Sequence, residues 1–255
     1  MRLADRIVDL LYCLQSEAGG LGITEIAGRT GFPKGTVHGL LKALAERSLV
    51  VQDPVTQRYG LGLGLLVMAS SLLRERNLLL GLTQQHMERL RDTSGETVCL
   101  HVAYGLERAC VGQVESFNDI RYTMEIGKPL PLYSGATGKL LLAHMPEQTV
   151  NQIIAVTGLE PLTTHTISDP DTLRRELAQI RITGYAVSFE ERSPLVAALA
   201  APIWDGSGKV IACLTIYGPR ARLDDARVEE LLPALLAAST DISRSLAAPP
   251  VGKTR

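Results

Sequence analysis

The stretch TEIAGRTGFPKGTVHGLLK, residues 24–42, decides how the first part of this chain folds. Thr24 is a residue type that caps helices, because its hydroxyl can accept a hydrogen bond from a free backbone N–H group. Gly31 suits a tight turn, and Pro33 presets the backbone angle at the start of a second helix. The apolar residues of that second helix recur at helical spacing: Val37, Leu40, Leu41 and Leu44. The pattern predicts a helix-turn-helix.

The face opposite this apolar stripe is the one that a helix-turn-helix lays into the DNA major groove. Its predicted DNA contacts are Lys34, Gly35, Thr36, His38, Gly39 and Lys42. The two glycines are unexpected there, since each costs a helix roughly 1 kcal/mol relative to alanine. Either the backbone approaches DNA closely at these positions, or the surface is simply not optimised for stability.

The segments on either side complete a winged helix. Residues 3–16 predict a helix that packs behind the other two, with its apolar side formed by Ala4, Ile7, Val8, Leu11 and Leu14. Residues 49–62 predict strand, turn and strand, with the turn at Asp53-Pro54. Arg58, with Gln57, is the candidate for a phosphate contact from this wing. The alternative is a surface arginine without a partner.

Composition sets outer limits and does not by itself indicate DNA binding. The chain has 255 residues, of which 45% are hydrophobic and 21% charged, as in ordinary globular proteins. Its net charge is −1, and residues 1–62 carry seven basic against six acidic residues, a net of +1. There is no apolar run long enough to span a membrane and no signal-like start. Four scattered cysteines fit buried thiols in a reducing cytoplasm.

Residues 63–93 predict one long helix that links two domains. Leu63, Leu66, Leu73, Leu80 and Met87 keep a near-heptad spacing along it. This spacing is typical of a helix that also dimerises. Packing of the stripe onto the chain's own domain is the other interpretation, and the two are compatible.

From residue 94 to residue 247 the pattern is that of an α+β domain. Alternating residues predict three consecutive strands, ending with one over residues 120–126, in an antiparallel meander. Helices follow at about 135–144, 146–156 and 170–182, then strands at 184–189, 196–204 and 209–217, and a last helix at about 224–246. Strands, helices and strands in this order predict helices on the faces of an antiparallel sheet. Residues 248–255 look like a flexible tail.

Six motifs in this order resemble the IclR family of bacterial transcription regulators. They are PKGTVHGLLKAL at 33–44, RYGLG at 58–62, GETVCLHVA at 95–103, GKPLPLYSGATGKLLLAHMPE at 127–147, the long run at 159–191, and LAAPIWDGSGKVIACLTIYGP at 199–219. The resemblance implies a winged helix-turn-helix (1–62), a linker helix (63–93) and a GAF-like domain (94–247) that binds a small effector. It also implies homodimers or tetramers on a pseudo-palindromic operator.

The chain departs from this family at both expected sites. In the effector domain, Ser188 and Phe189 stand where the family often has acidic residues, and Ala197 and Ala198 stand where it often has an Arg-Cys pair. The family commonly has serine and arginine where Gly35 and Gly39 stand, so readout of bases by the helix centre is weakened. By analogy, the effector pocket is lined by Met124, Ser134, Ala136, Thr137, Ser188, Ala198, Thr215 and Tyr217. This mostly small and apolar set shows no paired cation for a dicarboxylate. It predicts an aromatic or short aliphatic acid as effector.

Motifs that resemble enzyme sites fail on spacing. Residues 134–139, SGATGK, lack the first glycine and the final serine or threonine of a P-loop, although their backbone amides could hold an effector carboxylate. Glu190 and Glu191 are adjacent, so on an extended segment they point to opposite faces. The five histidines have no metal-ligand spacing, and we expect them at the surface or capping helices. We expect no metal, no cofactor and no catalytic residues.

The sequence therefore predicts a cytoplasmic, effector-responsive regulator that binds double-stranded DNA, with repression as the commoner default. A transcriptional activator of the same class is the first alternative. A small-molecule enzyme with an accessory DNA-binding domain is a more distant alternative.

Overall fold

The computed structural model describes residues 2–15, 17 and 19–247, and only the backbone of residues 70–78. The predicted tail, residues 248–255, lies outside them. Within the described chain, no helix combines the length and the apolar character needed to cross a membrane. The chain divides into two compact units, Met1–Arg76 and Asn77–Arg255, and each is described by itself.

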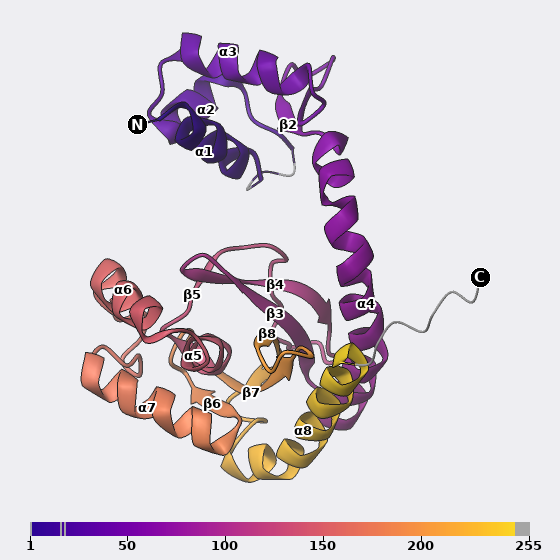
Figure 1. Cartoon of the computed structure of the whole chain (residues 1–255), viewed down its shortest axis with the longest axis vertical. Coiled ribbons are helices and arrows are strands. Elements are labelled where there is room, and N and C mark those ends of the chain that lie inside the picture. Colours follow the sequence, from indigo (N-terminus) through magenta and orange to yellow (C-terminus); the bar gives the residue numbers. More distant parts are fainter. Residues whose placement is uncertain (1, 16, 18, 248–255) are drawn as a thin grey trace, which may run out of the picture. The chain divides into compact units, whose positions relative to one another are not determined.

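The first unit has three helices, a two-stranded wing and the start of a long helix (Figure 1). Its elements are α1 (Leu3–Gln15), α2 (Ile23–Thr30), α3 (Lys34–Ala45), β1 (Val50–Gln52), β2 (Tyr59–Leu61) and the beginning of α4 (Leu63–Ser94). Leucine, isoleucine and valine from all three helices and the wing form one core: Leu10, Leu14, Ile26, Val37, Leu41, Leu44 and Val50 among them. The predicted apolar stripe of α3 is thus buried.

Two local predictions in this unit are wrong. The cap of α2 is Gly22 and not Thr24, because the bridge between Leu21 and Tyr59 holds the chain extended up to Gly22. The Glu25 carboxylate then accepts from the Gly22 N–H at 2.7 Å. In α1, Leu10 is fully buried and Val8 is 47% exposed. Val8 lies about 200° around the helix from Leu10, so it cannot share the buried stripe.

The end of the wing passes very close to the end of α3. A Cβ atom on Gly62 would lie 2.1 Å from the Ser48 carbonyl oxygen. The Gly62 N–H donates to the Leu49 carbonyl at 2.9 Å, which fixes this approach. Only glycine fits here, and this explains the glycine that closes the RYGLG motif.

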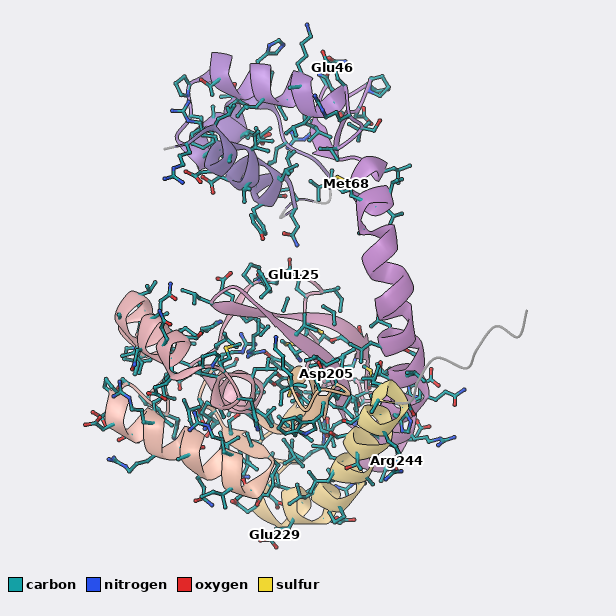
Figure 2. All side chains as sticks on the ribbon, viewed as in Figure 1. Glu46, Met68, Glu125, Asp205, Glu229 and Arg244 are labelled. Carbon is teal, nitrogen blue, oxygen red and sulfur yellow. The ribbon has the colours of Figure 1, made fainter. Side chains whose placement is uncertain are left out.

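The second unit is an α+β domain built on one antiparallel sheet, as predicted. Its strands are β3 (Thr97–Tyr104), β4 (Glu107–Val114), β5 (Leu130–Pro131), β6 (Ala186–Phe189), β7 (Val196–Trp204) and β8 (Val210–Pro219). They lie in the order β5-β4-β3-β8-β7-β6. The helices are α5 (Gly135–Ala143), α6 (Glu147–Thr157), α7 (Pro170–Thr183) and α8 (Asp225–Ala247). Figure 2 labels Asp205 in the β7–β8 turn and Glu46 at the end of α3.

Each face of this sheet carries its own core. Ala198 and Ala200 of β7 point to the face covered by α5, while Ala197 and Leu199 point to the face covered by α8 (Figure 1). The second half of α4 contributes Leu79, Met87 and Leu90 to the core on the α8 side of the sheet. The alternation of β7 is therefore that of a strand buried on both sides.

The predicted third strand of the meander does not form. Residues 120–126 make a loop whose only ladder contact among the described residues is a bridge between Cys110 and Ile126. The free edge of β4 pairs instead with the short β5, and the other edge of β3 pairs with β8. Only two of the four apolar residues in this alternation face inward. Met124 is buried and Tyr122 half-buried, whereas Ile120 and Ile126 are 76% and 54% exposed.

The near-heptad stripe of α4 has two different environments. Leu63 and Leu66 are 78% and 57% exposed, whereas Met87 is 1% exposed in the core of the second unit. The Leu73 side chain lies outside the described residues. The C-terminal part of the stripe thus packs onto its own domain, and the N-terminal part remains open.

Candidate functional site

The exposed face of α3 displays the side chains that were predicted to meet DNA. Lys34, His38 and Lys42 are exposed and Thr36 is half-buried. Gly35 and Gly39 lie between them, and a Cβ at either position would meet no atom within 4 Å. The face therefore carries lysines towards both ends, with His38 and two positions without side chains between them. Nothing in the free protein requires the glycines.

Arg58 of the wing is held by the chain itself. Its Nε donates to the Gly20 carbonyl at 3.0 Å, and its Nη2 lies 2.9 Å from the Glu25 carboxylate. The alternative of a surface arginine without a partner is wrong. Arg58 also sits at the base of the turn, whereas Gln57 lies in the turn itself. A phosphate contact from Arg58 would compete with Glu25, and this contact stays a prediction.

In the second unit, the start of α5 holds a carboxylate from the chain. The Gly135 N–H donates to the Glu191 carboxylate at 3.2 Å, and the Ser134 hydroxyl donates to the Glu191 carbonyl at 3.2 Å. These amides were expected to be available to an effector carboxylate. Glu191 already occupies that position, because the loop after β6 brings it there.

Lys139 is the lysine that makes SGATGK resemble a phosphate-binding loop, and it is already paired within the chain. Its Nζ lies 2.5 Å from Glu191 and 2.8 Å from Glu176, and the side chain is 2% exposed. Burial raises the pKa of Glu191, and the charge of Lys139 opposes this shift. Lys139 is thus committed to a buried ion pair and Glu191 to its two partners.

A hydrogen-bonded group of hydroxyls lies under the middle of α5. The Thr137 hydroxyl is 3.0 Å from that of Thr215 and 2.5 Å from that of Tyr217. All three residues are buried. Burial raises the pKa of Tyr217 to about 12, so its phenol stays protonated and neutral.

A small hollow of about 20 Å³ opens beside this group, between α5 and the sheet. Four predicted residues line it: Ala136, Ser188, Ala198 and Tyr217. Ser134, Thr137 and Thr215 do not line it, because they are buried in contacts with the chain. Met124 lines a second hollow of about 330 Å³ on the other side of Tyr122 and Arg192.

Two arginines that were not predicted from the sequence, Arg108 and Arg192, also line the smaller hollow of about 20 Å³. The expectation that the pocket lacks a paired cation is therefore wrong. The alternation of strand residues could have identified Arg108 as an inward-facing residue. In β4 it lies two residues before the buried Cys110, so the two side chains face the same side of the sheet. The predicted strand began at Ala109 and left it out. Arg192 lies in a loop, where periodicity gives no indication.

His101 lies deeper on this face of the sheet. It is fully buried, its ring is 5.8 Å from that of Tyr217, and neither ring nitrogen has a hydrogen-bond partner. Burial, helped by the charges of Arg108 and Arg192, holds its pKa well below the ordinary value. The expectation of a surface or capping role is wrong for His101. His144 does cap, since its Nδ1 is 2.9 Å from the Leu140 carbonyl.

The cysteines are buried or half-buried, and none forms a disulfide. Cys99 and Cys110 lie on neighbouring strands, as considered from the sequence. Among the described residues, no three or more histidine, cysteine or acidic side chains are placed to hold a metal ion. The polar groups at the hollow are two arginines, several hydroxyls and the Glu191 carboxylate, which is already paired with Lys139. The two arginines are suited to binding an anion.

Comparison with known proteins assigns both units. The family model "Bacterial transcriptional regulator IclR C-terminal" matches residues 73–244, and "IclR helix-turn-helix domain" matches residues 3–54. The chain belongs to the IclR family of bacterial transcriptional regulators.

Relatives in this family match along nearly the whole chain. The HTH-type transcriptional regulator BhcR of Paracoccus denitrificans is 33% identical over 97% of this chain and 88% of its own length. The HTH-type transcriptional repressor AllR of Escherichia coli is 31% identical over 95% of this chain and 89% of its own. The crystal structure of the Thermotoga maritima IclR has a TM-score of 0.70 at 28% identity, and covers 96% of this chain and 98% of that one. The IclR fold thus extends over both units.

Proposed function

We propose that this IclR-family protein is a repressor of a catabolic operon that loses its operator when a small organic acid binds. The observation that carries this proposal is the pair of uncompensated arginines in a hollow of the effector domain. The similarity to AllR, which is named a repressor, supports repression. Activation by the same kind of acid is the alternative within this family.

The DNA-binding half of the proposal rests on α3. Lys34 and Lys42 project from its exposed face, and His38 lies between them. The lysines would contact phosphates, while Gly35 and Gly39 on either side of His38 allow close approach of the backbone. Recognition would then depend on DNA shape as well as on base edges.

The effector half of the proposal rests on charge. A buried guanidinium without an anion is costly, and an organic acid would relieve that cost. Tyr122 and Tyr217 stack at 5.2 Å beside the hollow and offer aromatic surface to the body of such an acid. These contacts support an aromatic or short aliphatic acid as effector.

Assembly into a dimer is a further part of the proposal. Four neighbouring residues at the start of α4 are exposed and apolar: Leu63, Leu66, Val67 and Met68. An unpartnered apolar stripe on a helix is typical of a surface that pairs with a second copy. Two winged helices would then meet two half-sites of a pseudo-palindromic operator, and dimers could pair into tetramers. Both the cytoplasmic location and the absence of an enzymatic reaction follow from this role and are proposed with it.

Gel-shift titration of the chain's own upstream DNA tests the proposal. We expect Lys34→Ala and Lys42→Ala to weaken binding to every sequence and to lower the salt dependence by about one counterion per subunit. Lys209→Ala, an exposed lysine of the β7–β8 turn, is the matched control and should change neither quantity. Unchanged binding in both α3 variants would contradict this interface, and conversion of an added acid into product would favour an enzyme.

A further inference from the structure

Arg108 carries an unused hydrogen-bond donor inside the effector domain. The residue is 1% exposed, its Nε donates to the Pro131 carbonyl at 3.2 Å, and its Nη1 has no partner. Buried arginines are normally paired with an acid, because a guanidinium removed from water needs a counter-charge. No ion pair to Arg108 is found within the described chain. Its side chain lines the hollow described above.

Arg192 is the second cation of the same hollow, and its partners are neutral. Its Nη2 donates to the Tyr122 hydroxyl and lies 3.9 Å from the Met124 sulfur. Neither group carries a charge that could compensate the guanidinium. Arg192 therefore binds a phenol where a carboxylate would be the stronger partner.

The acidic side chain of the hollow does not neutralise these arginines. Glu191 is bound by the Lys139 ammonium at 2.5 Å and by the Gly135 N–H at 3.2 Å. Lys139 in turn also contacts Glu176. Lys139, Glu191 and Glu176 together carry one positive and two negative charges, and the Glu191 carboxylate is paired with Lys139. Neither Arg108 nor Arg192 forms an ion pair with Glu191 among the described residues.

Tyr122 and Arg192 also separate two spaces. The inner hollow of about 20 Å³ has room for little more than a water molecule, whereas the outer hollow is about 330 Å³. Both spaces are lined by Tyr122 and Arg192, which lie in the loop segments before β5 and after β6. Glu125, labelled in Figure 2, marks the first of these segments. An acid that takes Arg192 from Tyr122 would remove this wall and join the two spaces.

We propose that the effector is a compact dicarboxylic acid, with one carboxylate held by Arg108 and the other by Arg192 once Arg192 has left Tyr122. This inference rests on the proposed function, because it takes the hollow to be the effector site. It assigns the second acidic group of the ligand to Arg192 and the first to Arg108. Exchange of the phenol for a carboxylate is the local change that binding makes.

Calorimetry and thermal unfolding of the full chain with matched acids test this assignment. The dicarboxylates are malonate, succinate and phthalate, and each is compared with the acid lacking one carboxylate: acetate, propionate and benzoate. We expect at least one dicarboxylate to raise Tm and to bind about tenfold or more tightly than its partner, as one charge-assisted hydrogen-bonded contact implies. Equal affinities within each pair, or no shift with any dicarboxylate, would overturn the proposal.

Variants of the two arginines separate ligand binding from folding. Arg108→Met should keep or raise Tm without ligand, because it removes an uncompensated buried charge, and should abolish the shift by the dicarboxylate. Arg192→Gln should lower the affinity for the dicarboxylate to about that of the monocarboxylate. Arg121→Gln is the matched control, since Arg121 lies next to Tyr122 in the loop before β5 and pairs with Glu115. A dicarboxylate affinity that survives Arg192→Gln would contradict the role of Arg192.

Operator binding, measured separately, distinguishes the two levels of the proposal. If monocarboxylates bind as well as dicarboxylates and still release DNA, the repressor function stands and the dicarboxylate assignment falls. If a dicarboxylate binds through the two arginines while no operator is found, the assignment stands and the repressor function falls.

Discussion

At the scale of single residues, the effector domain buries polar nitrogen atoms that have no hydrogen-bond partner, and this lowers its stability. Arg108 has an unpartnered nitrogen and His101 has two, and all three atoms are buried. Such groups are rare in folded proteins and are usually explained by function. The arginine points to an anionic ligand. The histidine has a different consequence, which is a dependence of stability on pH.

His101 predicts loss of stability in mild acid. Its pKa lies well below 6.5 in the folded state, because of burial and the charges of Arg108 and Arg192. The unfolded chain takes up a proton near pH 6.5 and the folded protein does not, so stability is present above that pH and falls below it. Each pH unit lowers the free energy of unfolding by up to about 1.4 kcal/mol from this residue alone. Urea titrations followed by fluorescence of Trp204, the single tryptophan, measure it.

We expect His101→Leu to flatten this dependence between pH 6.5 and pH 5. The exposed His38 provides the control, since His38→Gln should leave the pH dependence as it is. A His101→Leu profile as steep as that of the unaltered chain would show that other groups cause the acid sensitivity.

The buried pair of Lys139 and Glu191 gives a second residue-scale prediction. Lys139→Met leaves the Glu191 charge without its closest partner and should cost about 3–5 kcal/mol of unfolding free energy. The double variant Lys139→Met with Glu191→Gln should recover much of this loss, because the uncompensated charge is gone. Equal losses in the single and double variants, measured by urea unfolding, would mean that packing rather than charge is at stake.

The sequence predicted those residues of the candidate site that stand in family motifs, and it did not predict those that lie in irregular loops. Ala136, Ser188, Ala198 and Tyr217 came from motif positions and line the hollow. Arg192 and Tyr122 could not be predicted, because both lie in irregular loops whose course depends on tertiary contacts. Thr137 and Thr215 do not line the hollow, because both are buried and their hydroxyls are bonded to each other.

At the scale of secondary structure elements, helical and strand periods predicted most of the fold. The stripe of α3, the wing and helix α7, which begins after the cap at Asp169, all appear as expected. The failure at residues 120–126 is instructive. The apolar alternation there does not mark a strand, because only Tyr122 and Met124 face inward. The Gln113 side chain accepts from the Met124 N–H at 2.6 Å and holds this loop without a ladder.

The exposed face of α3 gives an element-scale prediction. Gly39→Ala adds a methyl group that meets nothing in the free protein. It should stabilise the first unit by roughly 1 kcal/mol through helix propensity. If the backbone approaches DNA closely at this position, operator affinity will stay level or fall despite the gain in stability. Thermal unfolding and gel-shift titration of the same variant decide the matter, and tighter binding would refute close approach.

The open half of the α4 stripe gives a prediction about assembly. Leu66 is 57% exposed beside Leu63 and Val67. Leu66→Lys should shift the protein towards monomer in sedimentation velocity, because a charge would be buried in the pairing surface. Val55→Lys, on the exposed wing tip, is the control and should leave the oligomeric state unchanged. A Leu66→Lys protein that sediments like the unaltered chain would place the dimer interface elsewhere.

At the scale of the whole molecule, the proposed function requires coupling between two sites that lie in separate units of the chain. Such coupling requires only that the acid bind differently to the DNA-competent and the DNA-free states. Typical coupling free energies correspond to changes in affinity of roughly 5- to 150-fold. By reciprocity, operator DNA should weaken binding of the acid by the same factor. The family relationship supports this two-site arrangement.

DNase footprinting of the chain's own upstream DNA, with and without the acid, tests this coupling most directly. We predict protection of one pseudo-palindromic segment by the full chain, and loss of that protection when a dicarboxylate that raises Tm is added. The Arg108→Met variant should protect the same segment and no longer respond to the acid. Absence of protection on every fragment of the locus, or protection that the acid leaves unaltered, would contradict the account.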